Sequence, residues 1–169
     1  MDWTRPATVS GGHRPHVERP VATNASPVVL RLLPHVPHPP ARVAVCGPHA
    51  SGDGPALRAR GYRVEAGPTD AASASGWHPE APLDAVCDGG LLRTVPLEAR
   101  PHWAARMALH VRPGGRLFGA FATGDAPGAI GASELSALLG ASFDVERLTE
   151  SAFTDDDGAP LLEAVFARR

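Results

Sequence analysis

The segment Leu83-Asp-Ala-Val-Cys-Asp-Gly-Gly90 decides the fold, because a short apolar run in it ends in an acid and two glycines. Such a run is typical of a buried strand, and the glycines indicate a tight turn directly after it. Residues 96–111 follow with apolar side chains every four positions, which predicts a helix. Pro113-Gly-Gly115 ends that helix, and 116–121 has the pattern of the next strand. This order predicts two parallel strands joined by a right-handed helical crossover.

The same rhythm occurs upstream of this segment. Residues 42–46 form a short apolar run that opens into a Gly/Pro/Ser loop over 47–54. We expect one or two helical turns over 55–60, stopped by Gly61, and a second strand over 62–66. Strands that alternate with helices imply a mainly parallel sheet.

The two ends of the pattern complete the prediction. Ser26 followed by Pro27 is a typical start of a short helix. Ser133 is expected to cap a helix that runs to Leu139, and the turn-rich 155–158 separates two further strands, 143–148 and 161–167. We therefore predict an α/β, Rossmann-like fold with about six strands, mostly parallel and closed by a C-terminal antiparallel hairpin.

The interval between Gly67 and Leu83 is short for this fold class. A parallel crossover alone needs roughly a dozen residues, and the small residues 71–76 cannot provide both a helix and a strand. We predict that the third strand is reduced or absent. Trp77 has two open roles there, stacking on a nucleotide base or burial of an exposed sheet edge, of which the second is favoured.

Composition limits the function classes. The chain has 169 residues, 43% hydrophobic and 20% charged, with a net charge of −2, so we expect neither a nucleic-acid nor a membrane partner. No apolar run is long enough for a bilayer span, and residues 1–25 are expected to be a flexible lead-in to a domain over 26–169. All basic residues are arginine, which is typical of GC-rich coding and hints at a bacterial source.

The two cysteines, Cys46 and Cys87, provide no disulfide framework, which favours a reducing, cytoplasmic setting. They end two strands that should be neighbours, so we expect that their side chains could face each other near the site. Buried inert thiols are the favoured interpretation over a redox or metal pair, since no flanking spacing supports a metal site.

A family resemblance emerges from the order of these motifs. The segment 83–92, Val95-Pro96, Arg100 and the turn 112–117 resemble the second half of class I S-adenosylmethionine-dependent methyltransferases, and in particular the thiopurine S-methyltransferase family. The resemblance extends over residues 28–169. It implies S-adenosylmethionine as cofactor and methyl transfer to a small-molecule nucleophile, such as a thiol.

The resemblance also assigns a cofactor loop. Its usual glycine positions hold Gly47, His49 and Ser51, while its usual acid position holds Val45. The thiopurine-type family uses Ser-x-Asp in this loop, and Asp53 matches that pattern. The alternative is a glycine-rich turn between strand and helix without a ligand.

Other site residues follow from the same resemblance. Pro68 stands where an acid normally holds the ribose, so Asp70 is the substitute, unless it is a solvated loop acid. Asp88 is expected beside the reactive sulfur, with Leu91 in the cofactor set, and the alternative for Asp88 is a turn or helix-capping role. Arg100 matches the family's downstream arginine, so Asp88 and Arg100 are the two catalytic candidates. The alternative for Arg100 is an arginine on the surface or at the start of a helix.

Two functions therefore remain open from the sequence. The first is a methyltransferase that acts on a small molecule and needs alignment and water exclusion more than acid–base groups. The second is a methyltransferase-like domain without activity, which serves as a binding module or stabilises a protein partner. Pro68, His49 and the missing strand favour the second.

Overall fold

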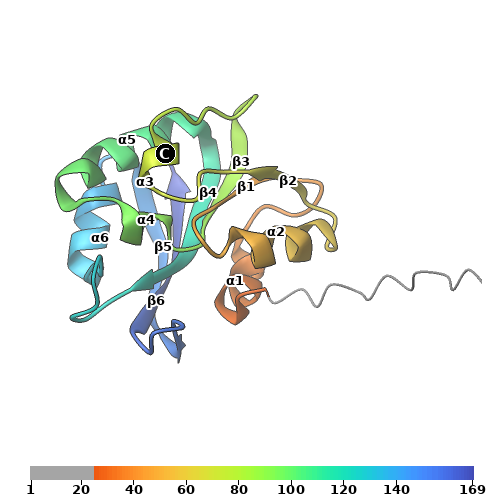
Figure 1. Cartoon of the computed structure of the whole chain (residues 1–169). Coiled ribbons are helices and arrows are strands. Elements are labelled where there is room, and N and C mark those ends of the chain that lie inside the picture. Colours follow the sequence, from red (N-terminus) through yellow and green to blue (C-terminus); the bar gives the residue numbers. More distant parts are fainter. Residues whose placement is uncertain (1–24) are drawn as a thin grey trace, which may run out of the picture.

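The computed structural model describes residues 25–169, and Figure 1 shows one twisted sheet between two layers of helices. Nothing is described for the predicted lead-in except Ala25. The strands are β1 (Arg42–Cys46), β2 (Arg63–Ala66), β3 (Leu83–Asp88), β4 (Val111–Ala122), β5 (Phe143–Thr154) and β6 (Pro160–Arg168). The sheet order is β2-β1-β3-β4-β6-β5, so the predicted Rossmann-like class is confirmed.

The strand pairings also match the prediction. The pairs β1–β2, β1–β3 and β3–β4 are parallel, whereas β6 runs antiparallel to β4 and β5. The final hairpin is therefore confirmed, although its strands are longer than predicted. Between Ala66 and Leu83 the structure has only a short helix and no strand, which confirms the loss of the third strand.

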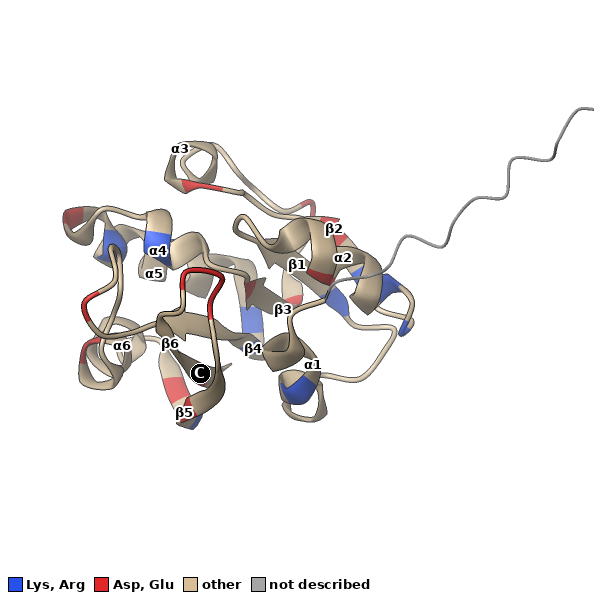
Figure 2. Ribbon diagram, turned by 60° about the horizontal axis from the view of Figure 1, so that its bottom comes forward, with Lys and Arg blue, Asp and Glu red and all other residues tan. Residues whose placement is uncertain are grey.

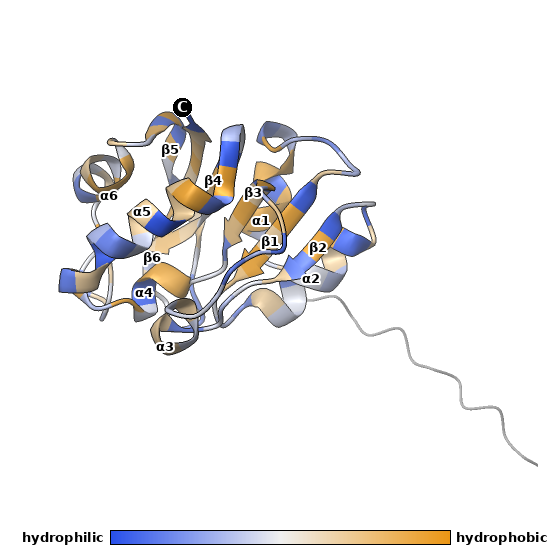
Figure 3. Ribbon diagram, turned by 90° about the horizontal axis from the view of Figure 1, so that it is seen from above, coloured by the Kyte–Doolittle hydropathy of each residue, from blue (hydrophilic) through white to orange (hydrophobic). Residues whose placement is uncertain are grey.

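The helices lie on both faces of this sheet. They are α1 (Pro27–Leu32), α2 (Ala50–Arg58), α3 (Ala71–Ala74), α4 (Leu91–Thr94), α5 (Arg100–His110) and α6 (Ala132–Leu139), with short 3-10 turns at Leu33–His35 and Leu97–Ala99. Figure 3 shows apolar colouring concentrated on the strands and polar colouring on the outer helix faces.

Two predicted helix starts are wrong. The helix predicted from residue 55 begins at Ala50, because the His49 carbonyl accepts the N–H groups of Gly52 and Asp53 and nucleates a turn through the glycines. The helix near the C-terminus has Gly131, not Ser133, at its cap position. The predicted helix 96–111 is divided into a 3-10 turn and α5.

A third difference concerns the turn Pro113-Gly-Gly115. It lies inside β4, which begins at Val111, and the β3–β4 pairing shifts register between Leu83 and Ala85. The turn is therefore a bulge in a longer strand rather than a connection before it.

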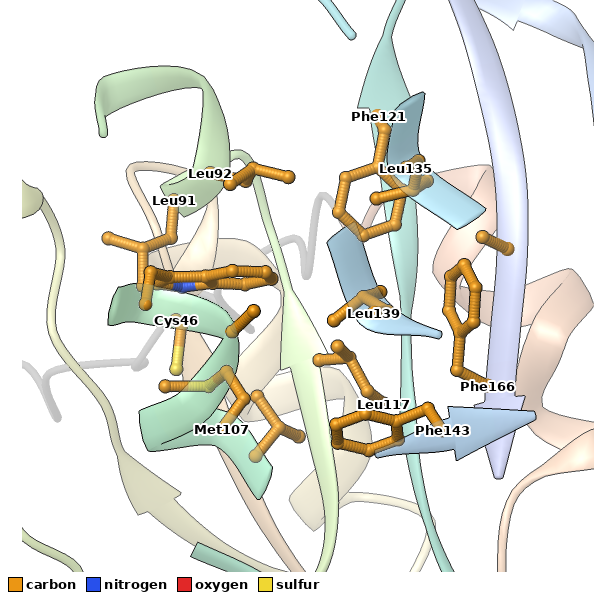
Figure 4. Packing of buried hydrophobic residues seen from close by; sticks show 14 of the residues in the cluster. Cys46, Leu91, Leu92, Met107, Leu117, Phe121, Leu135, Leu139, Phe143 and Phe166 are labelled. Carbon is orange, nitrogen blue, oxygen red and sulfur yellow. The ribbon is translucent and has the colours of Figure 1, made fainter. Parts of the chain in front are cut away.

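The core is divided by the sheet into two clusters. Figure 4 shows the larger one, where α4, α5 and α6 pack on the sheet through Leu91, Met107, Leu139 and Phe166. The second cluster joins α1 and α2 to the opposite face. Cys46 belongs to the first cluster and Cys87 to the second. The expectation that the two thiols could face each other is therefore wrong.

Candidate functional site

A cavity of about 490 Å³ lies at the carboxyl ends of β1, β3 and β4, next to the start of β6. The sheet order reverses between β1 and β3, since β2 lies beyond one and β4 beyond the other. In open α/β sheets such a switch point leaves a crevice where ligands bind. The volume is within the range of small-molecule sites.

The loop after β1 forms one wall of this cavity. Gly47 has a φ of +91°, a conformation that favours glycine, and its N–H donates to the Pro68 carbonyl at 2.8 Å. The N–H of His49 donates to the Gly89 carbonyl at 3.2 Å, so this loop contacts the loop after β3 directly. His49 and Ser51 both line the cavity, as does Gly52.

Asp53 is placed in the first turn of α2 and faces the cavity. Its residue surface is only 1% exposed. One carboxylate oxygen, Oδ1, accepts the N–H of Ser26 at 2.8 Å and connects α2 to the start of α1. The other oxygen, Oδ2, has no hydrogen-bond partner among residues 25–169. Burial raises the pKa of this carboxyl, against a smaller lowering by the Ser26 bond and the charge of His49.

Asp88 ends β3 and also lines the cavity, but its carboxylate is occupied by backbone. Oδ1 accepts the N–H groups of Gly90 at 2.9 Å and Leu91 at 2.7 Å, and Oδ2 accepts that of Leu92 at 3.2 Å. Burial raises the pKa of Asp88 to about 6, although these N–H bonds oppose the shift. The carboxylate thus holds the turn into α4, which is the alternative that the sequence left open.

Glycine keeps the cavity wall beside Asp88 open. Gly89 and Gly90 line the cavity. A Cβ at Gly90 would lie 3.3 Å from the His49 ring and 3.6 Å from Pro48, and one at Gly89 would lie 2.9 Å from the Cys46 carbonyl oxygen. The two loops are therefore packed so closely that glycine is required at both positions, and no side chain from either residue enters the cavity.

The far wall depends on Arg93, which the sequence analysis did not identify. Its guanidinium pairs with Asp155 at 2.6 Å and Asp157 at 3.0 Å, and Nε donates to the Pro127 carbonyl at 3.0 Å. Figure 2 shows the acidic tip of the β5–β6 hairpin turned toward α4. The acidic turn 155–158 was the available signal, because its negative charges favour a nearby arginine.

Four predicted residues do not line this cavity: Gly47, whose place in the loop after β1 is described above, and the three that follow. Arg100 is buried, donates to the Gly128 carbonyl at 2.8 Å and pairs with Glu134 at 3.3 Å, so it fixes the loop before α6 beside a second, open cavity. The Leu91 side chain is in the core. Asp70 is exposed and caps α3 through the N–H of Ser73, which lowers its pKa.

The ribose side of the site differs from a usual nucleotide crevice. The buried Pro68 occupies the acid position, and its carbonyl is already bonded to Gly47. The Trp77 indole N–H donates to the Ala66 carbonyl at 3.2 Å, at the end of β2, and the ring meets His110 edge-on. This placement corresponds to the favoured role of Trp77, covering a sheet edge.

Two further properties concern metals and membranes. Among residues 25–169, no three potential metal ligands come together. In that same range, no helix has the length and apolar character that a membrane span needs.

The two cysteines, Cys46 and Cys87, are buried. Burial raises the pKa of both thiols well above the ordinary value, which is typical of inert thiols.

No family model and no curated protein matches the sequence. Solved structures do match. A TehB-like SAM-dependent methyltransferase from Corynebacterium glutamicum has 17% identity and a TM-score of 0.66, covering 84% of this chain and 88% of the other. The 1,6-didemethyltoxoflavin-N1-methyltransferase of Burkholderia thailandensis, with bound 1,6-didemethyltoxoflavin and S-adenosylhomocysteine, has 21% identity and a TM-score of 0.70, covering 88% and 78%.

A third match is the magnesium protoporphyrin IX methyltransferase of Synechocystis PCC 6803 with bound SAM, at 16% identity and a TM-score of 0.60, covering 84% and 76%. Together these similarities show that the chain has the fold of SAM-dependent methyltransferases. They do not single out the thiopurine-type subfamily.

Proposed function

We propose that this chain binds S-adenosylmethionine and is a methyltransferase for a small-molecule acceptor. The observation that carries the proposal is the cavity at the switch point between β1 and β3, in a fold shared with proteins that bind this cofactor. Gly52, Gly89 and Gly90 line it without side chains, which suits the close approach of the cofactor's methionine end.

The two ends of the cofactor meet unequal surroundings. The methionine end fits the glycine-lined cavity. The ribose end finds Pro68 in place of a carboxylate, and Asp70 is bonded to Ser73 and lies outside the cavity. A missing charge-assisted bond typically lowers affinity about ten- to a hundredfold. We therefore expect weak binding.

The cofactor, when bound, supplies an electrophilic methyl group. The residues of this chain hold the walls of the cavity in place and exclude water from it. Asp88 holds the turn 89–92 in place, Arg93 fixes the hairpin tip over the far wall, and the start of α1 covers the near wall. Phe121 and Leu161 add apolar surface that excludes water.

The finer assignment is a thiopurine S-methyltransferase-like enzyme with a thiol acceptor in a cytoplasmic setting. The ordered motifs 83–92 and 112–117 support it. A thiol ionises without a strong base. Of the four acids that line the cavity, Asp53 and Asp88 are buried, Asp155 is paired with Arg93, and Asp156 is exposed, so a soft nucleophile suits this site.

A second function is favoured by one observation. The loop after β1 is bonded to Pro68 and Gly89, so backbone donors that often serve a nucleotide are used within the chain. This arrangement supports a methyltransferase-like domain that has lost methyl transfer and serves as a binding module or stabilises a protein partner.

Calorimetric titration with S-adenosylhomocysteine separates the two functions. The methyltransferase proposal predicts saturable heat with a dissociation constant of roughly 0.1–1 mM, which corresponds to about 4–5.5 kcal/mol of binding free energy. An absence of heat at millimolar ligand would contradict it in favour of the binding module. Transfer of a labelled methyl group from S-adenosylmethionine to a thiol such as thiophenol tests the acceptor separately.

A further inference from the structure

The unusual group in the cavity wall is the free oxygen of Asp53. The side chain is buried in a wall that a ligand would contact, and Oδ2 has no partner among the described residues. A buried carboxylate oxygen without a hydrogen bond is costly and rare in folded proteins. The missing partner is therefore a donor that residues 25–169 do not supply.

The surroundings of this oxygen leave space for such a donor. A Cβ built at Gly89 would lie 3.4 Å from Asp53 Oδ2 and 3.5 Å from the His49 Cβ, so only a glycine keeps this position open. The other oxygen is held by Ser26, which fixes the direction of the carboxylate.

The charges around the cavity favour a cationic donor. Arg93 is the arginine in the cavity lining, and its guanidinium is already paired with Asp155 and Asp157. Asp88 is saturated by backbone N–H groups. A single free oxygen suits an ammonium group, whereas a guanidinium prefers two parallel oxygens.

We propose that Asp53 Oδ2 binds the ammonium group of the ligand in this cavity. The proposal rests on the proposed function and specifies its ligand. Two sources share this chemistry, the α-ammonium of the cofactor and an amine on the methyl acceptor. Asp88, the other buried acid of the cavity, is not available for this role, because its oxygens already accept backbone N–H groups.

The first test compares two ligands that differ at the amino-acid end. S-adenosylhomocysteine carries the α-ammonium, and 5′-methylthioadenosine lacks the amino-acid end. Wild-type protein should bind the first about ten- to a hundredfold more tightly, and Asp53→Asn should reduce that preference to a few-fold. A preference that survives in Asp53→Asn would overturn the assignment to the cofactor.

The second test addresses the acceptor, with benzylamine and benzyl alcohol as probes, each titrated with and without S-adenosylhomocysteine. A preference for benzylamine that Asp53→Asn removes assigns the ammonium to the acceptor. The proposal is overturned when neither ligand pair shows an ammonium preference that depends on Asp53. Binding of benzylamine without any nucleoside binding would support the role of Asp53 while contradicting the methyltransferase proposal.

A control variant separates charge from structure. Ser26→Pro removes the N–H that holds Oδ1 but leaves the carboxylate, and the φ of −55° at Ser26 is compatible with proline. Because this variant keeps the negative charge, its ammonium preference should fall by much less than that of Asp53→Asn. If Ser26→Pro lost the ammonium preference to the same degree as Asp53→Asn, the connection to α1 rather than the charge would be responsible for the preference. That result would overturn the proposal.

Discussion

Replacement of Asp88 by alanine should lower the free energy of unfolding by about 3–5 kcal/mol, because buried N–H groups lose their acceptor at an estimated 1–3 kcal/mol each. The carboxylate accepts from Gly90, Leu91 and Leu92, and the latter two residues are fully buried. Urea unfolding followed by circular dichroism measures the change. Asp125→Ala is the control and should change stability by less than about 0.5 kcal/mol, because this exposed loop acid has no ion-pair partner among residues 25–169. Equal effects in the two variants would contradict the role of Asp88 in holding the turn.

The same carboxyl gives a pH dependence with a definite sign. Burial raises the pKa of Asp88 from 3.8 to about 6, so the fold favours the protonated form. Its contribution to stability is complete below about pH 4 and is lost as the pH rises through 6, by about 3 kcal/mol for a shift of roughly two units. Asp88→Asn cannot titrate. The stability of the wild type relative to Asp88→Asn should therefore fall between pH 4 and pH 7, and a constant difference would contradict this.

Replacement of Gly47 by alanine should cost about 3 kcal/mol or more, because backbone strain and overlap add together. The φ of +91° disfavours any residue with a Cβ, and that atom would overlap the Gly89 carbonyl oxygen and lie 2.6 Å from the Leu91 nitrogen. The loops after β1 and β3 would have to separate at the point where the cavity begins.

Gly124→Ala isolates the strain from the overlap. Gly124 has a φ of +80°, and nothing lies within 4 Å of a Cβ built there. This control should cost only about 1–2 kcal/mol, the usual cost of a left-handed conformation. Thermal and urea unfolding of both variants provide the comparison. An equal loss in the two would mean that the loops after β1 and β3 are not in tight contact.

The sequence predicted the layered fold because its signals are local. Apolar runs, glycine turns and the acid-rich turn before β6 each lie within a few residues, so the strands and the final hairpin could be located. The short interval before Leu83 similarly excluded a third strand. The start of α2 was missed because glycines within residues 50–54 suggested a loop, whereas His49 nucleates the helix through its carbonyl.

The site was harder to predict because its walls join distant parts of the chain. Ser26 meets Asp53, and Arg93 meets Asp155, across separations that no local pattern records. The two cysteines show that the pairing register between β1 and β3 could not be predicted from the sequence. Val45 pairs with Cys87 and Cys46 with Asp88, so an offset of one residue places the two thiols on opposite faces of the sheet.

The central claim is that S-adenosylhomocysteine binds in the cavity at the switch point between β1 and β3. Amide chemical shifts of ¹⁵N-labelled protein, followed during titration with this ligand, test it most directly. We expect saturable shifts at Gly52, Gly89 and Gly90, and none at Glu150 on the exposed edge strand. Unchanged positions for the three glycines at millimolar ligand would contradict the claim.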